Sequence, residues 1–321
     1  MPLTTRLMAI LALALLLLPT GCGQEGGSSA VSHGDSGNKI LNLAGKAGSY
    51  VVLDMKALNA SGLIELIKKN LPDEAEAKLD EVTKGMGVDP FQSFSLLAVW
   101  GSDFMKPDGL NIAIVTDMPS EKINQALTYI DGRTKEEKTR EQPPMNVAVL
   151  GAFDKEIILA LTRKSSKELK DLPAEEGISL YRKDDATLGI IDRKAVLAGP
   201  SAASIKGLWK SISDASSSGS ALLAAGEILK VNAVVNKDKI SRIEASIVSQ
   251  SGDLQIKALV EAIDVETAEQ FCGGIKMIPG LALMGAKAMN DKLKEALSKL
   301  TADIDGTKVR ISLTIPKEAL Q

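Results

Sequence analysis

The chain has 321 residues, with 38 Lys and Arg against 41 Asp and Glu, a formal net charge of −3 and a hydrophobic share of 45%. A weakly acidic surface offers no electrostatic attraction to phosphate backbones, so nucleic acid is not expected as a partner. The hydrophobic share is ample for a packed core, either in one large domain or in two of average size.

The chain begins with the features of an export signal. Arg6 is followed by an unbroken apolar run, Leu7–Leu18, which is too short to span a bilayer comfortably. Pro19-Thr20-Gly21 then comes before Cys22, and polar, glycine-rich sequence follows. Residues 1–21 are therefore predicted to be a signal peptide that is removed and takes no part in the fold.

The stretch from Leu18 to Cys22 resembles the lipobox of bacterial lipoproteins, in which the cysteine is lipidated and becomes the mature N-terminus. Pro19 departs from that pattern, because leucine is usual at its position. The resemblance implies an exported protein that is held at a membrane by lipid on Cys22. Gly23 stands where aspartate would favour the inner membrane in that family, which implies an outer-membrane lipoprotein facing the periplasm. The alternative is an ordinary signal peptide with a chance cysteine near its cleavage site.

Two cysteines and one histidine limit the available chemistry. With Cys22 lipidated, Cys272 has no disulfide partner and is expected to be a small buried residue, with a reactive thiol as the alternative. Ser-His-Asp catalysis, Cys/His zinc sites and His-ligated haem need a histidine in a folded site, whereas His33 is expected in a solvated linker. The sequence contains no P-loop or dinucleotide fingerprint, so no nucleotide, cofactor or metal is expected.

Residues 22–47 are predicted to form the lipidated N-terminus and a flexible tether, because glycine, serine and polar residues dominate from Gly23 to about Gly48. Beyond the tether the periodicity alternates between strand and helix, in a first half (48–176) and a second half (177–321). The predicted strands are Tyr50–Asp54, Ser95–Trp100, Leu110–Thr116, Met145–Leu150, Glu156–Leu161, Ile178–Arg182, Thr187–Asp192, Ala195–Ala198, Ile243–Val248, Leu254–Glu261 and Lys308–Ile315. Helices are predicted after Ser61, Leu71, Pro119 and Ser201.

Short connections between strands that follow one another favour an α+β fold, with mostly antiparallel sheets and helices packed on one face. The two halves share this coarse pattern without a position-by-position repeat, so duplication is a hypothesis. The C-terminal stretches Gln255–Glu261, Asp264–Gln270 and Gly306–Pro316 resemble uncharacterised domains of secreted bacterial lipoproteins. That resemblance brings no known activity.

The segment Phe271–Leu300 carries more apolar residues than a one-faced helix needs. A helix broken at Pro279 would expose this segment or bury it deeply. Core packing is one interpretation, and a Met-lined groove for a lipid or an apolar partner is the other. The candidate groove residues are Met277, Leu281, Met284 and Met289.

Neighbouring carboxylates such as Asp184-Asp185 and Glu175-Glu176 could supply an acid and a base, but most such pairs are solvated charges. No catalytic residue is assigned. The sequence predicts an envelope lipoprotein with a non-catalytic binding or structural role, and the alternative is a hydrolase that depends on Asp or Glu. A concave pocket with two facing carboxylates would favour the enzyme, and an apolar groove near residues 277–289 would favour the binder.

Overall fold

The computed structural model describes residues 33–64, 80–81, 83–85, 87, 89–102, 104, 109–122, 145–165, 169–183, 186–218, 222–237, 239–285 and 291–320. Runs of two to four consecutive strands are separated by helices in most of this part. The strands are β1 (Ser49–Asp54), β2 (Phe94–Gly101), β3 (Asn111–Thr116), β4 (Asn146–Leu150), β5 (Lys170–Asp171), β6 (Ser179–Lys183), β7 (Ala186–Ile191), β8 (Ala195–Gly199), β9 (Glu227–Lys237), β10 (Ile240–Gln250), β11 (Asp253–Ala262), β12 (Thr301–Asp305) and β13 (Lys308–Ile315).

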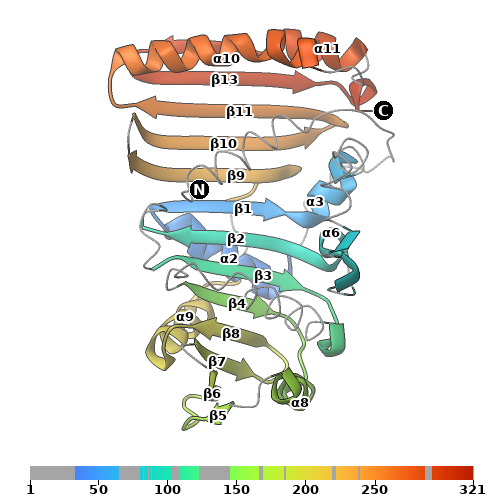
Figure 1. The fold of residues 1–321 in the computed structure, drawn as a ribbon, viewed down its shortest axis with the longest axis vertical. Helices are drawn as coiled ribbons and strands as arrows, with labels where there is room; N and C mark the ends of the chain where they lie inside the picture. The colour runs from blue at the N-terminus through green and yellow to red at the C-terminus, as the bar shows by residue number, and fades with distance from the viewer. Residues whose placement is uncertain are drawn as a thin grey trace.

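These strands form one sheet in the order β12-β13-β11-β10-β9-β1-β2-β3-β4-β8-β7-β6-β5 (Figure 1). Among the described pairs, β3 and β4 run parallel and the other neighbours run antiparallel. The helices with given bounds are α2 (Gly34–Lys46), α3 (Met55–Ala60), α6 (Pro90–Ser93), α8 (Lys155–Ser165), α9 (Ala202–Asp214), α10 (Val265–Gly285), α11 (Asp291–Ser298) and the short 3-10 helix η1 (Lys317–Ala319). The predicted α+β class with mostly antiparallel strands is confirmed.

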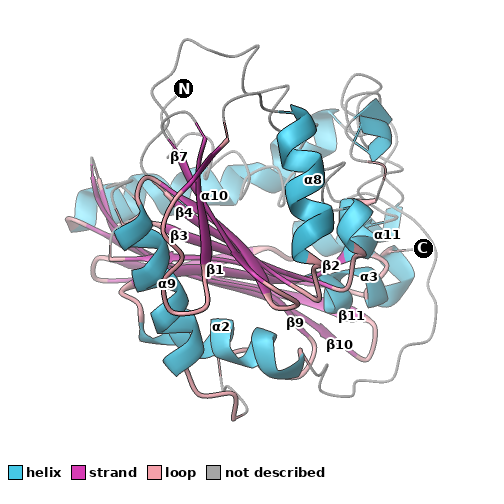
Figure 2. Ribbon diagram, turned by 90° about the horizontal axis from the view of Figure 1, so that it is seen from below, coloured by secondary structure: helices cyan, strands magenta, loops and turns pink. Residues whose placement is uncertain are grey.

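Helices cover both faces of the sheet, so the expectation that they pack on one face is wrong. Figure 2 shows α2 and α9 on one face, and α8, α3 and α11 on the other. The cause lies in the central strands. In β1, for example, Val52 is fully buried against the α2 face, while its neighbour Leu53 packs into the cluster around α3. Since side chains alternate along a strand, a continuous apolar run needs cover on both sides.

The core on the α2 face is built from fully buried aliphatic side chains. Ile40 of α2 and Ile205 of α9 pack with Val52, Leu96 and Leu197 of the sheet, all at 0% exposure. Burying each such side chain contributes about 1.5–3 kcal/mol. These contacts make α2 and α9 integral parts of the fold.

On the opposite face, the described helices α3, α8, α10 and α11 cover different parts of the sheet. Phe153 and Ile158 anchor α8, while Leu293 and Leu297 of α11 pack near Leu313 of β13. The long helix α10 contacts β11, β12 and β13. This face therefore has an apolar interior from α8 at one end to α10 at the other.

Strand β1 joins two parts of the sheet that come from distant segments of the sequence. It pairs with β2 on one side and with β9 on the other, so that Val51 lies opposite Val99 and Val231. Strand β4 likewise pairs with β8. The predicted halves 48–176 and 177–321 therefore share one sheet. The predicted boundary at residues 176 and 177 lies in the connection between the paired strands β5 and β6.

Residues 34–46 form helix α2, whereas the sequence analysis placed them in the tether. The glycine and serine content of the segment suggested a solvated linker. However, Gly37, Ile40, Leu41 and Ala44 recur at helical spacing, and all four are buried. The apolar stripe outweighs the poor helix propensity of the other residues, because burial against the sheet stabilises the helix.

Helix α8 occupies the segment that was predicted as the strand Glu156–Leu161. The reason is an N-cap that the prediction overlooked. The Asp154 carboxylate accepts hydrogen bonds from the backbone N–H groups of Glu156 (2.9 Å) and Ile157 (3.2 Å). Such a cap satisfies the free donors of a first turn and starts a helix at this point.

Helix α10 continues through Pro279 to Gly285 without a break. A proline removes one hydrogen bond and favours a kink, but the turns before it are fixed by packing on the sheet. Ala268 and Cys272, one turn apart, are 0% and 2% exposed. The helices predicted after Leu71 and Pro119 fall mostly outside the described residues.

Candidate functional site

The face that carries α2 continues past β1 onto β9, β10, β11 and β13, where polar side chains replace apolar ones. Strand register places Tyr50, Asn232, Glu244, Leu259 and Arg310 side by side across five strands. The neighbouring row consists of Lys230, Ser246, Lys257 and Ser312. We call these two rows, together with Glu227 and Arg242, the polar floor.

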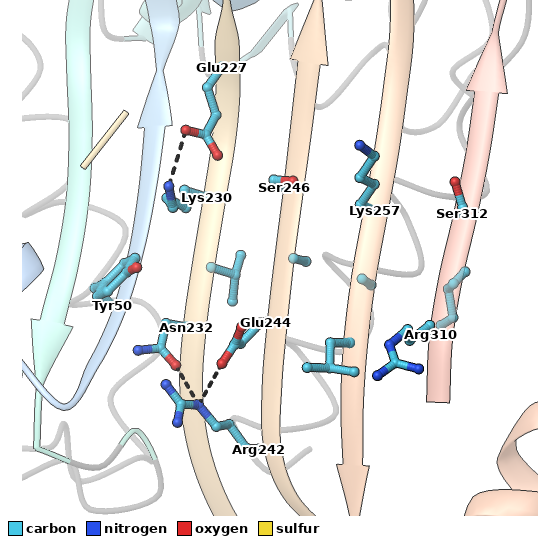
Figure 3. Close-up of a pocket in the computed structure, with 15 residues that line it drawn as sticks. Tyr50, Glu227, Lys230, Asn232, Arg242, Glu244, Ser246, Lys257, Arg310 and Ser312 are labelled. Carbon is cyan, nitrogen blue, oxygen red and sulfur yellow. Dashed lines mark hydrogen bonds and ion pairs between the residues drawn. The ribbon is translucent and has the colours of Figure 1, made fainter. Parts of the chain in front are cut away.

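A depression of about 550 Å³ lies over the polar floor (Figure 3). Tyr50 stands at its edge on β1, next to the part of the sheet that α2 covers. Volumes of roughly 300–1,000 Å³ are typical of small-molecule sites. The depression is therefore large enough for a small ligand.

Two groups of charges organise the floor. Glu227, with a side chain 4% exposed, accepts a hydrogen bond from the backbone N–H of Ala224 (2.8 Å) and pairs with Lys230 (3.3 Å). On β10, the Nε of Arg242 lies 3.0 Å from Glu244 and donates to the side-chain oxygen of Asn232, also at 3.0 Å. Each carboxylate therefore has a cation beside it.

Tyr50 is the aromatic residue of the site, and its hydroxyl keeps its proton. Burial raises the pKa of the phenol above its ordinary value of 10.0, and the nearby carboxylates of Glu227 and Glu244 raise the pKa further. A negative charge on the phenol would be desolvated and repelled there. At neutral pH Tyr50 is therefore a hydrogen-bond donor.

The two carboxylates of the depression do not face each other. Glu227 lies opposite Val248 in the strand register, and Glu244 lies four positions earlier on β10, so about 13 Å separates their backbone positions along the strands at roughly 3.3 Å per residue. Paired catalytic carboxylates in glycoside hydrolases lie about 5–9.5 Å apart. This depression therefore lacks the geometry that would favour the hydrolase.

A second depression, of about 490 Å³, lies at the N-terminal end of α2 and includes His33 in its lining. The prediction that His33 is a solvated linker residue is wrong, because its side chain is only 7% exposed. Its Nε2 lies 3.1 Å from a carboxylate oxygen of Asp54, whose side chain is 4% exposed. The other oxygen of Asp54 accepts the backbone N–H of Ala57 and caps α3. This buried pair ties the start of α2 to the junction of β1 and α3.

Cys272 is buried at 2% exposure, and its thiol donates to the backbone oxygen of Ala302 (3.3 Å). The prediction of a small buried residue is confirmed. Within the described ranges, no three His, Cys, Asp or Glu side chains are grouped so as to hold a metal ion.

The predicted groove residues are not brought together into a described cavity. Met277 is 63% exposed on α10 and lines neither depression. Leu281 and Met284 belong to α10, but their side chains lie outside what the structure describes, as do Met289 and Cys22. The groove and the lipidation therefore remain predictions.

Sequence reasoning missed the polar floor because it missed strand β9. The segment Leu229–Val235 alternates between core-facing residues such as Val231 and floor residues such as Asn232, which is a strand signal. Even with β9 identified, the grouping of Tyr50 with Asn232 and Arg242 depends on long-range register. No local pattern contains that information.

No family model and no curated protein matches the chain. Among solved structures, crystal form III of TP0453 aligns with a TM-score of 0.38 and 8% identity, covering 88% of this chain and 94% of that one. Crystal form IV of TP0453 aligns with a TM-score of 0.36 and 9% identity, over 90% and 94% of the two chains. At these values the likeness assigns neither a family nor a function. Among the described helices, none is long and apolar enough to cross a membrane.

Proposed function

We propose that the chain is an outer-membrane lipoprotein, held by lipid on Cys22 and facing the periplasm, whose folded part binds a lipid or an apolar partner segment without catalysis. The observation that carries the binding role is the exposure of Met277, 63%, on a helix that is firmly packed through its other side. The outward side of α10 is the proposed binding element.

The geometry of α10 supports this assignment. Ala268 and Cys272 point into the sheet, and Met277 is five residues beyond Cys272, which places it on the opposite side at 3.6 residues per turn. A Cβ added at Gly273, Gly274 or Gly280 would meet no atom within 4 Å. The outward surface near Met277 is therefore open and bears little side-chain bulk.

Exposed apolar residues concentrate at this end of the sheet. In the described part of the chain, the large apolar side chains with high exposure are Ile263 (57%), Val265 (49%), Met277 (63%) and Ile304 (41%). Ile263 lies just before α10, Val265 is the first residue of that helix, and Ile304 belongs to β12, which α10 contacts. Single exposed apolar residues are common, but their concentration around one helix supports an interaction surface.

The alternative, a hydrolase dependent on Asp or Glu, has less support. The carboxylates of the polar floor are far apart along the strands, and each is held by a cation. An acid and base pair needs two carboxyl groups around one reacting bond. Binding is therefore the function that the described geometry favours.

Replacing Met277 with Gln tests the binding element. We expect the free energy of unfolding to change by no more than about 0.5 kcal/mol, because the side chain is exposed. Flotation of a chain beginning at Gly23 with phosphatidylethanolamine vesicles should fall several-fold in this variant. The matched control is Lys276→Gln, an exposed neighbour, which should leave both measurements unchanged. A loss of stability of several kcal/mol with normal flotation would instead assign Met277 to core packing.

Acylation of Cys22 has a separate test. In bacteria fed with labelled palmitate, we expect the label on the wild-type chain and none on the Cys22→Ser variant, because only the thiol of Cys22 is in the lipobox-like position. The variant should also leave the membrane fraction on extraction without detergent. Equal labelling of both chains would refute the anchor, while leaving the role of α10 to the vesicle experiment.

A further inference from the structure

The polar floor contains three side chains with hydrogen-bond donors for which no acceptor is assigned within the described residues. Tyr50, Asn232 and Arg242 come from the adjacent strands β1, β9 and β10, and the first two lie opposite each other in register. Figure 3 shows Tyr50 and the pair of Asn232 and Arg242 along one edge of the depression. We infer that these three residues form a binding site for an oxyanion, namely the carboxylate or phosphate group of a ligand.

The Nε of Arg242 is held by contacts within the chain, whereas its two terminal amino groups have no assigned acceptor among the described residues. Its Nε–H serves both the side-chain oxygen of Asn232 and the carboxylate of Glu244, each at 3.0 Å. The structure assigns no partner within the described chain to its two terminal amino groups. An arginine oriented in this manner presents a planar pair of donors that matches the oxygens of a carboxylate or a phosphate.

Asn232 and Tyr50 add donors beside that pair. Because the oxygen of the Asn232 amide accepts from Arg242, its NH₂ group must point the other way, and no acceptor for it is assigned among the described residues. The Tyr50 hydroxyl likewise has no assigned acceptor there, and its raised pKa keeps it protonated. A group of donors without acceptors selects a ligand rich in acceptor oxygens.

The charge of the depression agrees with an anionic ligand. Its lining contains four cationic side chains against two carboxylates, Glu227 and Glu244, and one of the four, Arg310, is already paired with Asp305 outside the lining. Glu244 already occupies the Nε side of Arg242, so an anion would approach the terminal amino groups. Lys257 has no assigned partner in the described chain and adds to the attraction. The cations in this lining are Lys230, Arg242, Lys257 and Arg310.

This site is separate from the proposed binding surface on α10. Register places the floor on the α2 face of the sheet, whereas α10 packs on the opposite face. The oxyanion could belong to a soluble phosphate or carboxylate, or to a phospholipid headgroup. The chemistry of recognition is the same for both sources, so the experiment uses both.

Isothermal titration of the mature chain with inorganic phosphate and with succinate tests the inference, and titration with phosphatidylglycerol vesicles identifies the source. We expect saturable binding of at least one of these probes. Arg242→Gln should weaken it at least tenfold, and Arg242→Lys should not restore it, because lysine lacks the paired donors. Tyr50→Phe, which removes only the hydroxyl, should weaken binding by about two- to tenfold.

Two further variants separate this site from general charge effects. Asn232→Asp keeps an oxygen for Arg242 but replaces the amide donors with a negative charge, so binding should be abolished. Arg310→Gln is the control, since Arg310 lines the same depression but pairs with Asp305 (2.8 Å). Binding in that control should change less than about threefold. The inference is overturned if no probe binds at millimolar concentration, or if Arg242→Gln and Arg310→Gln have equal effects while melting temperatures stay normal.

Discussion

A chain that lacks residues 1–47 is expected to lose on the order of 5–10 kcal/mol of stability, which is comparable with the whole stability of a typical domain. The truncation removes Ile40, Leu41 and Ala44, all buried in the core of the α2 face. It also exposes Val52 and Leu96, which α2 covers. Urea denaturation, monitored by circular dichroism, measures the loss of unfolding free energy.

The control for this truncation is a chain that lacks only residues 1–32. It keeps His33 and all of α2, so its unfolding midpoint should match that of the mature chain. Should the chain that lacks residues 1–47 prove too unstable to measure, Ile40→Ala provides a graded test with an expected cost of about 2–5 kcal/mol. Equal stability of the chains that begin at residues 33 and 48 would restore the view that residues 22–47 are a tether.

Replacing Asp54 with Ala is expected to cost about 2–4 kcal/mol, because one carboxylate performs two tasks. It caps α3 through Ala57 (2.8 Å), and it pairs with the buried His33 (3.1 Å). In the variant, both ring nitrogens of His33 would lack a partner among the described residues, since its Nδ1 has none already. The urea midpoint is the measurement.

A second Asp54 variant and a pair of glycine variants show whether the loss in the Asp54→Ala variant comes from this contact. Asp54→Asn keeps a cap for α3 and should lose clearly less than Asp54→Ala. Gly37→Ala should also destabilise, because its new Cβ would lie 2.3 Å from the Cβ of His33. Gly207→Ala in α9 meets no atom within 4 Å and should stabilise by about 0.5–1 kcal/mol. Identical effects of the two glycine changes would contradict the close packing of His33 on α2.

The secondary-structure predictions from the sequence were most accurate where the local residue pattern and the burial of those residues agree. The strand Leu254–Glu261 was predicted from alternation and a Ser-Gly-Asp turn, and it lies within β11. Prediction failed at α8, where a run rich in β-branched and apolar residues was taken for a strand and the Asp154 cap decided otherwise. It failed at α2 because average polarity concealed four buried positions.

The candidate sites were harder to predict than the fold. The sequence analysis placed His33 in a linker because its partner, Asp54, comes after α2 in the sequence, at the end of β1. Tyr50 and Arg242 are separated in sequence by about two thirds of the folded chain, and they line the same depression because β9 lies between their strands. Met277 was identified from apolar excess alone, and its exposure on the outer side of α10 agrees with a residue that core packing does not require.

The position of β1 in the middle of the sheet has a consequence for how the chain folds. Val51 pairs with Val99 and also with Val231, which lies much later in the sequence. A contact between such distant residues closes a long loop and slows folding. Because synthesis proceeds from the N-terminus, β1 to β4 are complete before β9 exists, and the open edge of β1 is free to pair with other chains meanwhile. The interval before β9 arrives is thus the period in which a newly made chain is most exposed to aggregation.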